Sequence, residues 1–208
     1  MQDALLTMLR MQDRMNTRVH PEWIDQGFAW HRAIWVECAE LVDHYGYKWW
    51  KHQDHDLAQV QLEVVDIWHF GMSACFRPGL SLEALAESMA GDWLGASQDV
   101  DRAGVLEAAE KLAGVAAGEG RFSVADFAAL LKAAQMSFDD LVRQYLGKNV
   151  LNFFRQDNGY KEGTYRKLWQ GREDNEHLME LLDQIDTAAP EAEQQLYTAL
   201  DERYRATA

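Results

Sequence analysis

Two short acidic motifs are the part of this sequence best suited to chemistry. Glu37 and Glu40 are three residues apart, and so are Glu63 and Asp66. Positions i and i+3 share one face of a helix, so each motif presents a pair of carboxylates. If the two helices lie antiparallel, joined by the segment 48–51, the four carboxylates converge. Such a cluster cannot stay fully ionised without a counter-charge, and for oxygen ligands the usual one is Mg²⁺ or another hard divalent cation.

Helical periodicity decides whether these motifs are only charges on a solvated face. In the helix of the first motif, Glu37 lies within an apolar stripe and Glu40 lies at the edge of that stripe. The other members of the stripe are Trp30, Ala33, Ile34, Leu41 and His44. In the second helix Glu63, Asp66 and Phe70 flank the stripe of Leu57, Val60, Val64, Ile67 and Gly71. An unpaired carboxylate among apolar neighbours is costly. We therefore interpret the four carboxylates as a functional cluster, although either motif alone is common on the surface of an acidic chain.

The composition is that of a compact protein. The chain has 208 residues, 48% of them hydrophobic, and eight are tryptophans, which excludes a disordered chain. A net charge of −14 repels nucleic acid phosphates and argues against a DNA- or RNA-binding module. Two cysteines are too few for a disulfide framework. The sequence shows neither a charged-then-apolar leader peptide nor an apolar run long enough to span a membrane. The expected location is therefore the cytoplasm, without a membrane partner.

Helix-period segments follow one another along the chain, and clear strand alternation is missing. The expected helices cover about 3–16, 21–44 with Pro21 at the start, 57–76, 81–93, 101–116, a segment opened by Ser123, 137–155, 174–186 and 190–205. The predicted fold class is all-α, a multi-helix bundle with a four-carboxylate core that binds Mg²⁺.

A basic segment follows the helix that ends near 155. It contains Arg155, Lys161, Arg166, Lys167 and Arg172 in a chain that is otherwise acidic. Lysine meets a phosphate as a point charge and arginine can clamp it with two hydrogen bonds, so the segment suits a triphosphate. The alternative is a basic loop that pairs with acidic helices of its own or another subunit.

Together these motifs resemble a known family. The runs ECAEL from Glu37, KWWK from Lys48, EVVDIWHF from Glu63 and FRQDNGYKEGTY from Phe154 are similar, in order and spacing, to the dimeric all-α deoxyuridine triphosphatases. These enzymes belong to the all-α nucleotide pyrophosphohydrolase superfamily. The resemblance covers about 5–76 and 145–178. The stretch 77–144 matches no motif, and we interpret it as a variable helical insert within one catalytic domain, 1–208.

The resemblance implies an enzyme that hydrolyses dUTP to dUMP and pyrophosphate and so limits uracil incorporation into DNA. A second candidate substrate is dUDP. Glu37, Glu40, Glu63 and Asp66 would hold two or three Mg²⁺ ions, which orient a water and neutralise charge on the phosphoryl oxygens. Glu37 is our candidate for accepting the proton of that water.

The resemblance also implies substrate-binding residues and a homodimer, and the net charge already argues against a nucleic acid partner. Gln12 and Asn16 would read uracil, since amides offer both a donor and an acceptor. The base and sugar would be lined by Trp49, His69 and Phe70, and the sugar 3′-hydroxyl would meet Asn152. The phosphates would be held by Tyr160, Lys161, Lys167 and Arg172, with Asn175 at the same end of the site.

Other functions stay open at this point. A related pyrophosphohydrolase could act on another nucleotide, such as dCTP or one with a damaged base. A non-catalytic helical interaction protein could keep the same fold. A zinc site is disfavoured, because His44, His52, His55 and His69 lack a compact ligand spacing.

Overall fold

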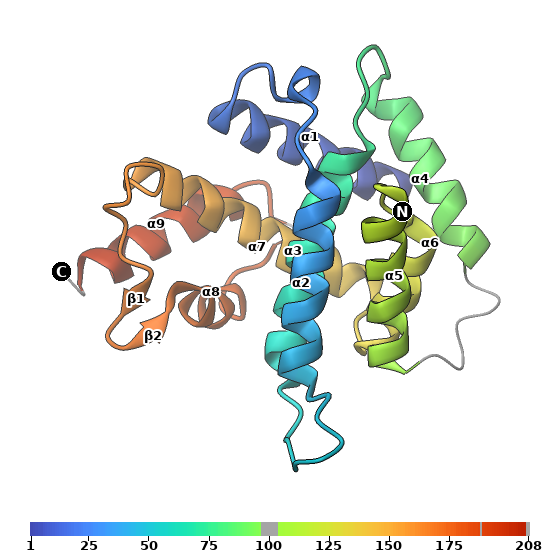
Figure 1. Cartoon of the computed structure of the whole chain (residues 1–208). Helices are drawn as coiled ribbons and strands as arrows, with labels where there is room; N and C mark the ends of the chain where they lie inside the picture. Colours follow the sequence, from blue (N-terminus) through green and yellow to red (C-terminus); the bar gives the residue numbers. More distant parts are fainter. Residues whose placement is uncertain (97–103, 188, 207–208) are drawn as a thin grey trace. The chain divides into compact units, whose positions relative to one another are not determined.

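The computed structural model describes residues 1–96, 104–187 and 189–206, and it confirms the all-α class (Figure 1). Within these ranges the elements are α1 (Gln2–Val19), the 3₁₀ helix η1 (Trp23–Gln26), α2 (Trp30–Tyr45), α3 (Leu57–Cys75), α4 (Leu82–Ala96), α5 (Val105–Glu119), α6 (Val124–Ala133), α7 (Phe138–Asp157), β1 (Leu168–Trp169), β2 (Arg172–Glu173), α8 (Asp174–Leu182) and α9 (Ala192–Arg205). None of the helices in these ranges is long and apolar enough to cross a membrane.

The chain forms two compact units, Met1–Phe138 and Asp139–Ala208, called here the N-terminal and C-terminal units. In the N-terminal unit α2 and α3 lie against each other and run antiparallel, joined by the loop 46–56 (Figure 1). Two local signals fix this hairpin. Gly46, with a φ of 86°, follows the last residue of α2, and the Asp56 side chain caps α3 by accepting a hydrogen bond from the backbone N–H of Gln59.

The buried side chains of α2 and α3 explain their pairing. Ile34, Cys38 and Leu41 of α2 are buried, which is the stripe expected of a helix with one covered face. On α3 the buried residues surround most of the helix: Val60, Leu62, Val64, Val65, Ile67, Trp68 and Met72. α3 is therefore the central helix of the unit, and it carries more than the single apolar stripe predicted.

The helices of the stretch 77–138 complete the core of the N-terminal unit. α4 contacts α1, α5 contacts α2, and α6 contacts α3, α4 and α5. Their aromatic side chains gather on Trp68, which stacks on Phe127 with ring centroids 4.8 Å apart and meets Trp93 at 5.8 Å. A Cβ added to Gly71 would come within 2.5 Å of the Phe122 ring, so this close approach requires glycine. The division into one catalytic domain with an insert stays a prediction.

The C-terminal unit has its own core. Its buried residues come from α7, β1, α8 and α9: Val150, Leu151, Phe154, Trp169, Leu178, Leu181, Leu182, Leu196 and Leu200. The short strands pair antiparallel through a two-residue turn, Gln170 and Gly171, both with positive φ. A strand pair this short carries no alternating pattern, and the sequence did not predict it.

Several helix boundaries differ from the expected ones. The second long helix was wrongly predicted to start at Pro21; it starts at Trp30, because η1 and Gly27 in the left-handed region with a φ of 61° come first. α8 ends at Leu182, short of residue 186. Ser123 is confirmed as the N-cap of α6, since its hydroxyl accepts from the backbone N–H of Asp126. Residues 101–103 of the expected 101–116 helix lie outside the described ranges.

Candidate active site

The α2–α3 hairpin brings three of the four predicted carboxylates together. Glu37, Glu63 and Asp66 each offer a carboxylate oxygen, and these oxygens lie within 4.8 Å of one another. Glu63 is only 8% exposed, and Glu37 and Asp66 are half-buried, so all three groups are partly withdrawn from water. An all-oxygen donor set of this charge fits a hard divalent cation such as Mg²⁺.

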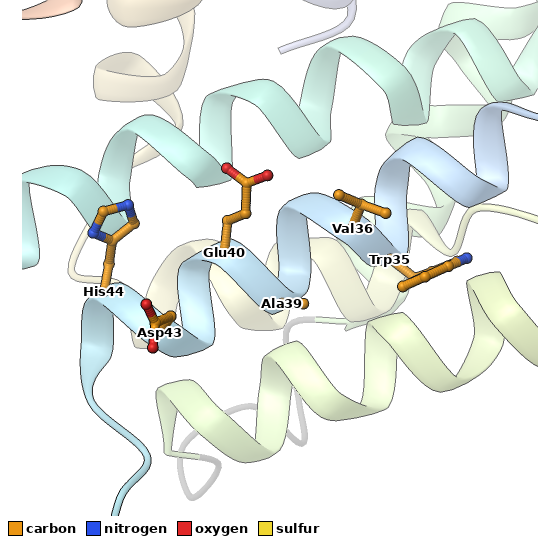
Figure 2. A pocket seen from close by; sticks show the side chains of 6 residues that line it. All are labelled: Trp35, Val36, Ala39, Glu40, Asp43 and His44. Carbon is orange, nitrogen blue, oxygen red and sulfur yellow. The ribbon is translucent and has the colours of Figure 1, made fainter. Parts of the chain in front are cut away.

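The fourth carboxylate, Glu40, is exposed and lies outside that triangle of oxygens. It lines a pocket of about 380 Å³ along α2, together with Trp35, Val36, Ala39, Asp43 and His44. In Figure 2 the Glu40 and His44 side chains project from α2 toward the side on which α3 lies. Glu40 therefore borders the cluster, and its charge still acts on Glu37.

Burial and the close approach of these carboxylates raise the pKa of Glu37. Burial, followed by the charge of Asp66 and the hydrogen bond and charge of Glu63, raises the pKa of Glu37 to about 8. His44 Nε2 lies 3.5 Å from a Glu63 oxygen and adds a positive charge when it is protonated. In the absence of a cation, Glu37 therefore holds a proton at neutral pH, and a bound cation would replace it.

A second constellation links α1 to α3 through buried polar side chains. Gln12 Nε2 donates to Ser73 Oγ at 3.0 Å and to Asn16 Oδ1 at 3.1 Å. Asn16 Nδ2 donates to the same Ser73 oxygen at 2.9 Å, and Gln12 Oε1 lies 2.9 Å from His69 Nδ1. The structure thus brings together three predicted base-pocket residues, Gln12, Asn16 and His69, and adds Ser73. We call these four residues the amide network.

The two predicted aromatic residues of the base pocket lie in different surroundings. Phe70 is half-buried and stacks on Trp30, with ring centroids 6.2 Å apart and an interplanar angle of 29°. Trp30 and Ser73 both line a pocket of about 260 Å³, which also includes Trp23, Phe28 and Phe76. Trp49 lies in the loop 46–56, is 90% exposed and contacts Trp50 edge-on. Phe70 thus stacks on an aromatic residue that lines the same pocket as Ser73, whereas Trp49 is exposed to solvent.

In the C-terminal unit Arg155 and Asp174 form a buried ion pair. Two guanidinium nitrogens of Arg155 each donate to Asp174 at 2.8 Å, and the Tyr165 hydroxyl donates to the same carboxylate at 2.8 Å. These interactions outweigh burial and lower the pKa of Asp174. Arg155 also donates to Asn152 Oδ1 at 3.3 Å and, at 3.5 Å, to Asn175 Oδ1, which accepts from Lys148 at 3.1 Å. Two predicted residues, Asn152 and Asn175, are therefore held by one cationic cluster.

The remaining predicted phosphate ligands lie on the surface of that unit. Lys167 pairs with Glu173 at 3.2 Å, and Arg172 pairs with Glu176 and Glu180 at 3.1 and 2.7 Å. Lys161 and Tyr160 are exposed, and the Tyr160 ring lies 5.9 Å from the Arg155 guanidinium carbon. For Lys167 and Arg172 the structure shows pairing with acidic residues of the same unit, which was the alternative interpretation of the basic segment.

Comparison with protein families now decides the class. A sequence profile of the dUTPase family matches residues 4–160. The chain belongs to the all-α dUTPase family. It is therefore an enzyme, a nucleoside triphosphate pyrophosphohydrolase of the dUTP diphosphatase class. A comparison with curated proteins finds none that matches this chain.

The range of the family match differs from the two stretches, 5–76 and 145–178, that carry the motifs. It runs through 77–144, where no motif is visible, and it contains the acidic cluster and the amide network. It ends at residue 160, before Lys161, Lys167, Arg172 and Asn175. The roles of all the predicted site residues stay predictions, and these four also lie outside the matched range.

Among the buried polar residues that the structure describes, three that hydrogen-bond to residues singled out in the sequence were themselves missed. Ser73 follows His69 by one helical turn, and Lys148, only 4% exposed, precedes Asn152 by one turn. Asp174 opens α8 and has no exposed surface. The one-turn spacing to a predicted residue was the available signal for Ser73 and Lys148. For Asp174 the sequence offers none, because its partner Arg155 belongs to another element.

Proposed function

We propose that this dUTPase cleaves dUTP to dUMP and pyrophosphate, with Mg²⁺ held by Glu37, Glu63 and Asp66 and with Glu40 completing the set. The observation that supports this is the α2–α3 cluster, whose three carboxylate oxygens lie within 4.8 Å of one another. Bound Mg²⁺ would lower the pKa of a water and offset charge on the phosphoryl oxygens. We propose two or three ions, because four carboxylates supply more donors than one ion needs.

Glu37 is the residue that we assign as general base. A water oxygen bonds to the α-phosphorus, the bond from that phosphorus to the α–β bridging oxygen breaks, and pyrophosphate leaves with the electron pair. The water's proton passes to Glu37. The proton needs an acceptor within the cluster, and Glu37, whose carboxylate lies beside those of Glu63 and Asp66, is the member that we assign to it.

The amide network is the part of the site that we assign to the base. Its members Gln12 and Asn16 supply buried amide groups on α1, and Phe70, which stacks on Trp30, supplies an aromatic face. A site built to hydrogen-bond one base edge rejects the wrong edge strongly. We therefore propose uracil specificity, with the sugar lined by Trp49 and His69.

The phosphates are assigned to the C-terminal unit. Asn152 would meet the sugar 3′-hydroxyl, and the phosphates would be held by Tyr160, Lys161, Lys167, Arg172 and Asn175. The ion pairs of Lys167 and Arg172 are exposed and therefore weak, so phosphate can compete with their carboxylates. We further propose a cytoplasmic homodimer, and dUDP as a second substrate.

Pyrophosphate release from dUTP, dCTP, dTTP and UTP, with and without Mg²⁺, tests the proposal. We expect turnover that requires Mg²⁺ and a kcat/KM for dUTP far above the others. Glu63→Gln should abolish turnover, whereas Glu87→Gln, an exposed carboxylate of α4, is the matched control and should not. Equal kcat/KM for dCTP and dUTP would instead support a pyrophosphohydrolase with another base specificity. Phosphate as the only product of dUTP would contradict the reaction itself.

A further inference from the structure

We propose that Arg166 is a positioning residue for the phosphate end of the site, and that it acts by fixing the basic segment to Tyr204 of α9. The inference rests on the proposed function, which assigns the phosphates to the C-terminal unit. Arg166 belongs to the basic segment that suits a triphosphate, but none of the proposed phosphate-binding roles falls to it. Neither Arg166 nor Tyr204 lies in the range 4–160 of the family match.

The basic segment contains two turns that are each hydrogen-bonded internally. In the first, the carbonyl of Gly159, whose φ is 89°, accepts from the backbone N–H of Thr164 at 2.9 Å, and this turn carries Lys161. In the second, the β1–β2 hairpin, the Lys167 carbonyl accepts from the backbone N–H of Asp174 at 3.0 Å. The two residues between these turns therefore set how the cations of one turn lie relative to those of the other.

Arg166 is held at this junction through both its backbone and its side chain. Its N–H donates to the Tyr204 hydroxyl at 3.4 Å, and its carbonyl accepts from Trp169 Nε1 at 2.7 Å. Its guanidinium carbon lies 4.5 Å from the centre of the Tyr204 ring, and Nη2 donates at 3.3 Å to the Tyr204 carbonyl, in the last turn of α9. A cation is favoured both over an aromatic face and at the C-terminal end of a helix.

Tyr204 can serve as an anchor because aromatic side chains surround it. Its ring stacks on that of Tyr165 with centroids 5.5 Å apart and an interplanar angle of 16°. It also contacts Trp169 at 5.3 Å and Phe154 at 5.4 Å, and both of these are fully buried in the core of the C-terminal unit. Arg166 therefore connects the basic segment to the core of the unit rather than to another surface side chain.

A preordered segment matters for affinity because the cations on it are exposed. Lys161 and Lys167 both lie at the surface, so their positions depend on the backbone that carries them. Ordering a backbone when a ligand binds costs conformational entropy, and this cost is subtracted from the affinity. Arg166 lowers the cost by holding the backbone in one arrangement before the phosphates arrive. Its loss should weaken phosphate binding and leave the chemistry of the acidic cluster in place.

The first measurement is the kinetics of dUTP hydrolysis with Mg²⁺ by Arg166→Met, which removes the cation and keeps most of the stem. We expect KM to rise about tenfold, the effect of one displaced charge-assisted hydrogen bond, and kcat to stay within about threefold of the parent. The inhibition constant of pyrophosphate should rise in parallel, and that of deoxyuridine should not. Arg205→Met is the matched control, since it removes the same charge from α9 and breaks only a surface pair with Asp201.

The second measurement is amide hydrogen exchange of the substrate-free protein. In Arg166→Met the backbone amides of 158–174 and of the last turn of α9 should exchange faster than in the parent, whereas in Arg205→Met those of 158–174 should not. Tyr204→Phe keeps the ring and should resemble the parent in both measurements. Arg166→Gln gives the same comparison if the methionine variant does not fold.

The two measurements together separate positioning from the other roles of Arg166. A higher KM without faster exchange would make Arg166 a direct phosphate ligand, and faster exchange with an unchanged KM would make its role structural only; either result overturns the inference. A Tyr204→Phe enzyme as impaired as Arg166→Met would also contradict it, because the ring would not be the anchor. The proposed function fails separately, if the parent enzyme releases no pyrophosphate from dUTP.

Discussion

The protonated Glu37 of the metal-free protein leads to a prediction about stability. We expect Glu37→Gln to stabilise the metal-free protein at neutral and alkaline pH and to leave its stability at pH 4.5 nearly unchanged. In the folded parent the pKa of Glu37 is raised from 4.5 to about 8, whereas in the unfolded chain it is ordinary. The contribution of Glu37 to stability is therefore fully present below pH 4.5 and is lost as the pH rises to about 8.

The size of this loss follows from the two pKa values. At about 1.4 kcal/mol per pH unit, the rise in pKa sets an upper limit of about 5 kcal/mol. Glu37 is only half-buried, so solvent screens much of this energy, and we expect about 2 kcal/mol. Glutamine has nearly the same volume and no charge, so the variant should gain about 2 kcal/mol over the parent at pH 8 to 9.

Urea unfolding in the presence of EDTA, at pH 4.5, 7 and 9, measures the effect. The free energy of unfolding of Glu37→Gln minus that of the parent should be near zero at pH 4.5 and rise to about 2 kcal/mol at pH 9. Glu87→Gln removes an exposed glutamate from α4 and controls for the change in net charge. Parallel pH profiles for the parent and Glu37→Gln would refute the reasoning, because Glu37 would then titrate as an ordinary surface carboxylate.

Three further predictions follow from the site and the fold. Glu63→Gln should reduce turnover by orders of magnitude while its metal-free melting temperature stays level or rises, and the increment in that temperature on adding Mg²⁺ should shrink; an undiminished increment would make the cluster structural. Asp174→Asn should destabilise the protein by about 3–5 kcal/mol in urea unfolding, because it leaves the Arg155 charge buried and unpaired, whereas Asp183→Asn, at the exposed partner of Arg143, should cost less than about 1 kcal/mol. Sedimentation should give about twice the 23.9 kDa chain mass, and a fully active monomer would contradict the homodimer.

The acidic cluster could be predicted because every signal for it is local. The i, i+3 spacing within α2 and within α3, and the apolar residues around it, are visible in a single window of sequence. Because α2 and α3 are consecutive and joined by a short loop, they are expected to pack against each other. The outlying position of Glu40 could not be predicted, because a rotation of α2 by a fraction of a turn decides which carboxylates meet.

The polar residues missed in the sequence depend on contacts between distant segments. Ser73 matters because α1 brings two amides to it, and Asp174 matters because α7 brings Arg155 to it. No window of sequence contains both partners. The second long helix was misplaced for a different reason: Pro21 is compatible with a helix start, but the positive φ of Gly27 interrupts the chain before Trp30.

The hairpin of α2 and α3 also bears on the order in which the chain folds. Its two helices are neighbours in sequence, so the acidic cluster needs only a short loop to close, whereas the bond from Gln12 to Ser73 spans 61 residues. Contacts between near neighbours form at lower entropic cost and so tend to form earlier. Mg²⁺ added during refolding should therefore act on the rate of folding by screening the carboxylates of an early hairpin. On this order of events, the carboxylates of α2 and α3 meet before the polar side chains of α1 reach α3.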